Sequence, residues 1–261
     1  MKKSIYHWYQ RLPPQFRDRV RWIRHPVNSF VTTAIYRLAQ HKVVSGPFKG
    51  MILVAEKPHL PYLLGTQELE LHQAIETLVG LGLEKIVNVG AADGYYAVGM
   101  TLRCPNAKIV AFEADTFRHE DLTAAAKANG VFERLQIEGR CEPSDLAAVL
   151  TPDERTLLIV DVEGYEMDLL DPDITTGLRD VFLLVETHDI LRQGCAQAMA
   201  RSFDKTHTID RLSTRSRNLG DFPIPTLRAF GAIARRSILG AMFEQRAGAQ
   251  EFLVMSPKCM R

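Results

Sequence analysis

Two acidic clusters follow strongly apolar segments of the chain. The apolar segment at residues 156–162 leads into three carboxylates within residues 161–166, and the segment at residues 181–186 ends in Glu186 and is followed by His188. Carboxylates gathered in this way are costly to bury unless they have a function or a partner. If the two segments are adjacent parallel strands, their carboxyl ends lie side by side, and the carboxylates face the imidazole across one cleft.

Such a cluster contains the residue types needed to take a proton from a hydroxyl group. His188 is the best candidate for the base because the reference pKa of imidazole is near neutrality, and Asp161 is either the alternative base or the group that orients the hydroxyl. We assign Asp161, His188 and Glu186 to a catalytic group. The alternative is that His188 only caps the end of its strand. The same three side chains have the atoms to hold a divalent metal ion, but their spacing is weak evidence for one, and we predict no metal.

A glycine-containing turn lies earlier in the chain, after a short apolar segment at residues 85–89. The turn covers residues 90–94, and Glu113 ends the next apolar segment 23 residues after Gly90. A glycine turn between a strand and its helix lets a ligand approach the backbone closely, and an acidic residue at the end of the second strand can accept both hydroxyls of a ribose. Together these features predict a site for an adenosine-type cofactor.

This turn lacks the features that a dinucleotide needs. The pattern G-x-G-x-x-G would seat a pyrophosphate on the N-terminus of the following helix. Here Ala92 occupies the position of the second glycine, and the bulky pair Tyr95 and Tyr96 follows. Because S-adenosylmethionine (SAM) carries no phosphate, a less open turn suffices for it. We therefore predict SAM, rather than NAD, as the cofactor.

Strand and helix patterns alternate around these motifs. Helices are expected over residues 95–103 and 117–129. An earlier helix is expected to be capped by Thr66, to carry Glu68 and Glu70 in its first turn and to end at Gly80. A short strand is expected at residues 51–54. The main strands are expected at residues 85–89, 108–113, 135–137, 156–162, 181–186, 206–209 and 251–255. This alternation predicts an α/β fold with a doubly wound, mostly parallel seven-stranded sheet.

The motifs resemble those of the FkbM family of SAM-dependent methyltransferases. They lie at residues 87–96, 111–115, 161–166 and 185–188, and the Asp-Val-Glu-Gly sequence at residues 161–164 is the most specific of them. The resemblance covers roughly residues 85–190. It implies a class I methyltransferase fold, which is Rossmann-like, and O-methylation, often of sugars or natural products.

One residue departs from the general class I pattern. Asn88 stands in the first strand where an acidic residue is usual, but its amide oxygen can still accept a hydrogen bond. We assign seven residues to the cofactor site: Asn88, Gly90, Ala92, Asp93, Glu113, Cys141 and Asp161.

The N-terminal segment carries most of the uncompensated positive charge. Residues 1–42 have a net charge of +8, whereas the remaining residues sum to −7. Both tryptophans of the chain also lie in this segment. We divide the chain into a basic, aromatic, helical and extended lobe at residues 1–64 and a SAM-dependent methyltransferase domain at residues 65–261. We expect residues 1–42 to contact an anionic membrane that carries a lipid-linked acceptor; a lid over the catalytic domain and an RNA-docking segment are the alternatives.

The acceptor expected from these features is a glycan, a sugar or a related small molecule. Seven arginines at residues 211–248 favour a phosphorylated or acidic one. An RNA methyltransferase that uses the basic lobe is one alternative, but no Asn-Pro-Pro-Tyr-type segment follows the fourth strand, so nucleic acid is disfavoured. A non-catalytic or NAD-binding protein is another. Four widely spaced cysteines and the lack of an apolar leader predict a cytoplasmic location, at the inner face of the membrane if the lobe docks there.

Overall fold

A seven-stranded sheet forms the centre of the protein. The computed structural model describes residues 25–258 apart from 152–153, 245, 247 and 249. The strand order is β3-β2-β1-β4-β5-β7-β6, in which β7 is antiparallel to both its neighbours and the other pairs are parallel. The strands are β1 (Lys85–Val89), β2 (Lys108–Phe112), β3 (Leu135–Glu138), β4 (Thr156–Val160), β5 (Phe182–Thr187), β6 (His207–Ser213) and β7 (Glu251–Pro257). The predicted mostly parallel, seven-stranded sheet is therefore confirmed.

Helices cover both faces of this sheet. The helices of the described residues, including those of a lobe beside the sheet, are α3 (Pro26–Ala39), α4 (Leu60–Leu64), α5 (His72–Val79), α6 (Tyr95–Arg103), α7 (Arg118–Ala128), α8 (Pro143–Val149), α9 (Glu166–Leu169), α10 (Cys195–Phe203), α11 (Pro225–Arg228) and α12 (Gly231–Ala241). The described residues also form four 3₁₀ turns: η1 (Leu69–Leu71), η2 (Phe132–Arg134), η3 (Thr176–Asp180) and η4 (Leu219–Asp221).

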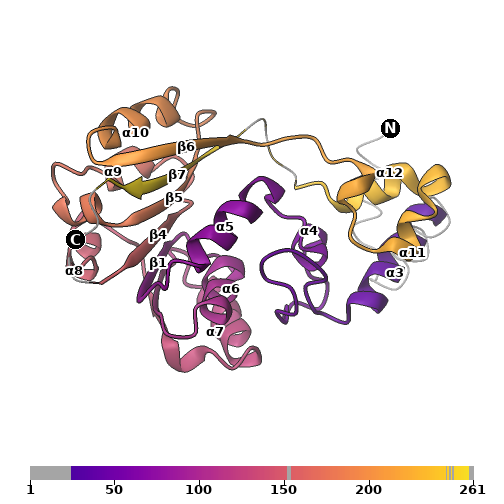
Figure 1. Ribbon diagram of the computed structural model, residues 1–261. Coiled ribbons are helices and arrows are strands. Elements are labelled where there is room, and N and C mark those ends of the chain that lie inside the picture. Colours follow the sequence, from indigo (N-terminus) through magenta and orange to yellow (C-terminus); the bar gives the residue numbers. More distant parts are fainter. Residues whose placement is uncertain (1–24, 152–153, 245, 247, 249, 259–261) are drawn as a thin grey trace, which may run out of the picture.

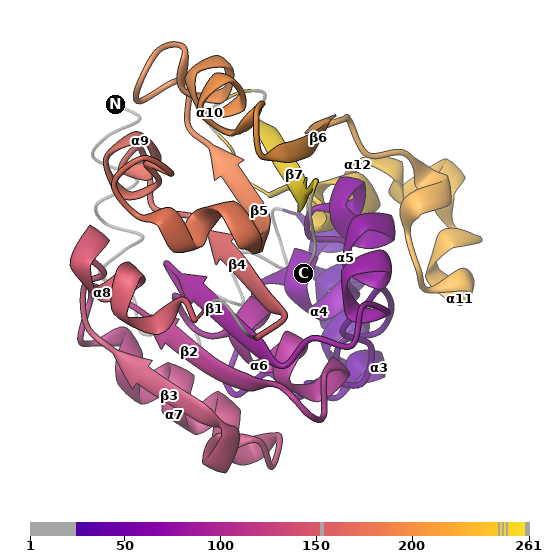
Figure 2. The same cartoon turned by 60° about the vertical axis from the view of Figure 1, so that its left-hand side comes forward.

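The alternation of side chains along the buried strands explains the two layers of helices. Ile86 and Ile159 point to a core with α5, α6 and α7, whereas Val87 and Val160 point to a second core with α8, α9 and α10. Figure 2 shows the latter three helices on their side of the sheet. All five residues of β4 are buried, as expected for a central parallel strand with helices on both faces. The sheet is thus doubly wound.

A smaller helical lobe stands beside the sheet (Figure 1). Its core contains Val31 and Ile35 of α3, Phe222, and Ile238 of α12, all of them buried. The lobe includes α3 and α4 from residues 1–64 and α11 and α12 from the later part of the chain. Residues 1–24, on which most of the expected membrane contact depends, lie outside the described residues.

None of the described helices is long and apolar enough to cross a membrane.

Two local predictions were wrong. Residues 51–54 do not form a strand, because only Ile52 makes a bridge, to Lys42, and its backbone N–H and carbonyl are bound by the side chain of Asn129. Thr66 does not cap a helix: its hydroxyl is buried without a hydrogen-bond partner in the described part of the chain. The helix begins later, at His72, after Glu68 has taken a left-handed conformation with φ of 48°.

Candidate functional site

The glycine turn brings the ends of two neighbouring strands into contact. Gly90 has a φ of 81°, and a Cβ added there would lie 1.8 Å from the carbonyl oxygen of Asp161. The backbone N–H of Asp161 in turn donates to the carbonyl of Val89, at 3.0 Å. The sequence suggested that a ligand requires this glycine. The structure shows a second reason for a glycine here: any side chain at position 90 would collide with the backbone of Asp161, directly after the neighbouring strand β4.

The side chain of Glu113 is held by the backbone of the turn. The N–H of Ala92 donates to Oε2 of Glu113 at 2.7 Å, and the N–H of Asp115 donates to Oε1 at 2.8 Å. Ala92 itself takes a left-handed φ of 49°, a conformation that is uncommon for residues other than glycine. Each carboxylate oxygen has a second lone pair, so Glu113 keeps acceptor capacity for further donors.

Two cavities meet at the carboxyl ends of the strands. One has a volume of about 390 Å³ and the other about 400 Å³, and both are lined by Gly90, Ala92, Asp161 and Glu163. The predicted cofactor residues are divided between them. Asn88 and Asp93 line the first cavity, Glu113 and Cys141 line the second, and Gly90, Ala92 and Asp161 line both. The predicted catalytic residues Asp161, Glu186 and His188 all line the first cavity.

His188 is fixed by a carboxylate that the sequence assignment left out. The side chain of Glu166 is fully buried, and its Oε1 lies 2.5 Å from Nδ1 of His188. Because a carboxylate accepts, Nδ1 donates, and Nε2 is turned toward the cavity, 3.5 Å from Oδ1 of Asp161 and 3.6 Å from Oε2 of Glu163. Glu166 is the third carboxylate of the acidic motif, so the signal was present in the sequence.

The surroundings change the protonation of this cluster. Burial lowers the pKa of His188, but the hydrogen bond to Glu166 and the nearby carboxylates raise it more, to about 9. Partial burial of Asp161 and the charge of Glu68 raise the pKa of Asp161 to about 6. Burial and the charges of Asp161 and Glu68 raise the pKa of Glu186 to about 8. At neutral pH His188 is therefore a cation and Asp161 is mostly ionised. The near-neutral pKa expected for His188 from its residue type alone does not hold here.

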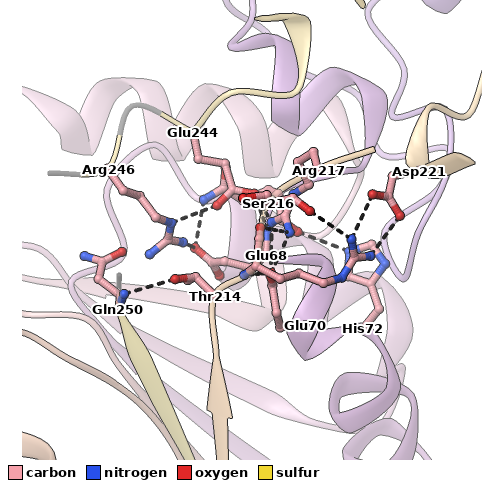
Figure 3. Close-up of polar contacts among 12 residues, drawn as sticks. Glu68, Glu70, His72, Thr214, Ser216, Arg217, Asp221, Glu244, Arg246 and Gln250 are labelled. Atoms are coloured by element: carbon pink, nitrogen blue, oxygen red, sulfur yellow. Dashed lines mark hydrogen bonds and ion pairs between the residues drawn. The ribbon is translucent and has the colours of Figure 1, made fainter. Parts of the chain in front are cut away.

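A network of ion pairs contributes side chains to the lining of the first cavity. Figure 3 shows Glu68, Arg217, Glu244 and Arg246 of this network. Arg246 donates to Glu186 at 2.5 Å, to Glu68 at 2.7 Å and to Glu244 at 2.8 Å. Arg217 extends the network, since it also bonds to Glu244.

Two glutamates of this network do not lie where the sequence predicted them. Glu68 and Glu70 were expected in the first turn of a helix, where acidic side chains face solvent and the helix dipole. Instead, Glu68 receives the hydroxyl of Tyr96 as well as Arg246, and Glu70 is bonded to Arg217. Their arginine partners are more than 140 residues away in the chain. No local sequence signal could have indicated these pairs.

Four of the seven arginines expected to bind an anion are occupied by carboxylates. In addition to Arg217 and Arg246, Arg215 forms a two-pronged pair with Asp221 at 2.8 Å, and Arg211 is paired with Glu251. A guanidinium that is already bound to a carboxylate has to lose that partner before it can bind a phosphate.

The atoms of a three-ligand metal site are also close together. One ligand atom from each of Asp161, Glu186 and His188 lies within 4.8 Å of the others. However, Glu186 already receives Arg246, so a metal ion there would share one of its ligands with a guanidinium.

The sheet order and polarity define an α/β protein of the doubly wound, Rossmann-like class. The chain is similar in structure to the O-methyltransferase TomG from Streptomyces achromogenes in complex with SAM, with 14% identity, 72% of this chain and 82% of that chain covered, and a TM-score of 0.43. It is also similar to cofactor-bound Rv0187 from MTB (11%, 94% and 96%, 0.45) and to TrmN from Thermus thermophilus (15%, 78% and 55%, 0.47).

No protein-family model matches the sequence, and no curated protein is significantly similar to it. The function of this chain therefore has to follow from its own residues.

Proposed function

We propose that the protein is a SAM-dependent O-methyltransferase of the FkbM type. The observation that carries this proposal is the junction of the two cavities at Gly90 and Asp161. Glu113 lies on one side of the junction and His188 on the other, with Nε2 of His188 3.5 Å from Oδ1 of Asp161 at the junction itself. A cofactor that spans the junction brings its reactive group next to a proton acceptor, which is the arrangement that methyl transfer to a hydroxyl needs.

The residues at the junction fit SAM. Glu113 keeps free lone pairs for the two ribose hydroxyls. Oδ1 of Asn88 is buried and has no hydrogen-bond partner among the described residues, so it suits the ammonium group of the methionine part. The side chains of Phe112 and Cys141 add apolar surface to the second cavity. When bound, SAM supplies an electrophilic methyl group on its sulfonium.

The proton transfer and the orientation of the acceptor depend on three residues of the protein. Asp161 is ionised above a pKa of about 6 and can take the proton of the acceptor hydroxyl. His188 keeps a proton on Nε2 below a pKa of about 9 and can donate it in a hydrogen bond to the acceptor oxygen. Glu166 holds the ring of His188 in the orientation that this bond requires. The proposed acceptor is a hydroxyl of a glycan, a sugar or a related small molecule.

Two measurements test this function. Calorimetric titration of the full chain with SAM, S-adenosylhomocysteine and NAD is expected to show binding of the first two only. Binding of NAD without binding of SAM would contradict the proposal. Transfer of labelled methyl from SAM is then followed into glycan, small-molecule and RNA fractions. Labelling of RNA alone would favour the nucleic-acid alternative.

A further inference from the structure

The first cavity is lined by many more acidic than basic side chains. Six acidic side chains line it, and the cations among the described lining residues are Arg246 and His188. The acidic side chains are those of Glu68, Asp93, Asp161, Glu163, Glu186 and Glu244. Glu186, with a pKa of about 8, is mostly neutral at pH 7, so the other five supply the negative charge. SAM carries one net positive charge, which does not balance this excess. Any acceptor that enters the cavity therefore meets a strongly negative field.

The two cations of the lining are already engaged. Arg246 is bonded to three carboxylates at 2.5–2.8 Å, and the next guanidinium, Arg217, is bonded to Glu70 and Glu244 (Figure 3). His188 is bonded to Glu166. Without breaking one of these pairs, an anionic acceptor could reach Nε2 of His188 alone, which lies 3.5 Å from Asp161 and 3.6 Å from Glu163 and would place the anion beside two carboxylates. Binding to either guanidinium would leave a buried carboxylate without its partner, which is costly.

The acidic side chains differ in how accessible they are. Those of Glu68, Glu186 and Glu244 are 6–8% exposed and lie within the ion-pair network. In contrast, the side chain of Asp161 is 48% exposed and that of Glu163 is 79% exposed, and both lie within 3.6 Å of Nε2 of His188. These two carboxylates remain available to a ligand, and they stand next to the position proposed for the acceptor oxygen.

We infer that the acceptor is a hydroxyl compound that carries a protonated amine, such as an amino sugar, and that the cavity rejects phosphorylated acceptors. The inference rests on the proposed methyltransferase function and replaces the phosphorylated acceptor favoured by the arginine count. The ammonium group binds between Glu163 and Asp161, and the neighbouring hydroxyl meets Asp161 and His188. An ammonium donates three hydrogen bonds and accepts none, which matches a wall of carboxylates.

The test compares sugars that differ mainly in charge. The full chain, saturated with S-adenosylhomocysteine, is titrated with glucosamine, N-acetylglucosamine and glucose 6-phosphate at pH 7 and one ionic strength. Glucosamine is expected to bind about tenfold or more tightly than N-acetylglucosamine, since a hydrogen bond to a charged group contributes about 1.5–3 kcal/mol. Glucose 6-phosphate is expected to bind more weakly than either. Equal affinities, no measurable binding of glucosamine, or tightest binding of glucose 6-phosphate with or without Mg²⁺ would overturn the inference.

A substitution of Glu163 tests whether this side chain causes the preference for the protonated amine. Glu163→Gln is expected to reduce the preference for glucosamine over N-acetylglucosamine by about twofold to fivefold, which corresponds to loss of one exposed ion pair. Glu133→Gln, at an exposed position on η2 outside the cavity lining, is the matched control and should keep the preference. An unchanged preference in Glu163→Gln would contradict the assignment of the ammonium site.

The same titrations separate this inference from the proposed function. If S-adenosylhomocysteine does not bind, the methyltransferase proposal itself fails. If it binds and the amine preference is missing, only the inference about the acceptor fails.

Discussion

The two cavities are built in opposite ways. The one that contains Glu113 is organised by backbone groups from a short stretch of chain, with the N–H groups of Ala92 and Asp115 holding one carboxylate. The other is organised by charged side chains that come from distant parts of the chain, such as Glu68, Glu186 and Arg246. A site made of backbone binds one constant ligand, whereas a site made of side chains can be changed residue by residue. This is the division expected between a cofactor and an acceptor.

The strongest test of this division is the removal of one carboxylate at the junction. Asp161→Asn should lower the rate of methyl transfer by about 10²–10⁴-fold, the usual contribution of a general base. Binding of SAM should change little, because the backbone of Asp161, which contacts Gly90, is kept. Single-turnover kinetics and calorimetry measure the two effects separately. A variant that keeps the wild-type rate would show that Asp161 does not act as the base.

The opposite result is expected on the cofactor side. Glu113→Ala should weaken SAM binding by about 1–3 kcal/mol, since a charged hydrogen-bond partner is lost. The rate at saturating SAM should fall much less than in Asp161→Asn. Calorimetric titration gives the affinity, and Glu133→Gln serves as a surface control. An unchanged affinity for SAM would remove Glu113 from the cofactor site.

The pH dependence of the rate tests the separate roles of Asp161 and His188 at the acceptor site. The rate should rise with pH as Asp161 ionises around pH 6 and fall as His188 loses its proton around pH 9. Glu166→Gln removes the charge that raises the pKa of His188, so the upper limb should move to lower pH by about one unit. An upper limb that stays in place in this variant would argue against His188 as its origin.

Protonation of His188 also affects the stability of the folded protein. The folded-state pKa of His188 is about 9, above the 6.5 of an unperturbed imidazole. The protonated ring therefore contributes stability that is fully present below pH 6.5 and is lost as the pH rises through 9. Thermal unfolding of the wild type and of Glu166→Gln, measured from pH 6 to pH 10, should converge toward the high end of this range.

The smallest effect is expected from metal removal. Methyl transfer should be unchanged after treatment with EDTA and dialysis, because Arg246 already bonds Glu186 and Glu166 already bonds His188. Loss of activity that Mg²⁺ restores would instead make Asp161, Glu186 and His188 metal ligands.

The features that were predicted correctly from the sequence are those determined by residues close together in the chain. The apolar residues of β4 and β5, and the turn between β1 and α6, are encoded by neighbouring residues, and they were found at the expected positions. The insertion of β7 between β5 and β6 is not encoded in this way, since strands of either polarity have the same alternation.

Side-chain partners were predicted less well than strands. Glu68 was interpreted from its helix-like surroundings, but Arg246, which is 178 residues away, determines where its side chain lies. In the same way, the protonation of His188 depends on the buried Glu166, and residue type alone suggested a different pKa. Both cases depend on burial and on contacts between residues far apart in the chain. Neither produces a periodic pattern in the sequence that could be recognised.

The packing of α3 against α12 also determines the order in which the molecule can be completed. The apolar side chains Val31 and Ile35 of α3 are made early in synthesis, but their partner Ile238 follows about 200 residues later. At roughly 5–20 residues per second, a ribosome needs on the order of 10–40 s to make the intervening chain. During that time the inner face of α3 has α4 but not α12 to pack against. We therefore expect the nascent chain to present a binding site for chaperones until α12 emerges.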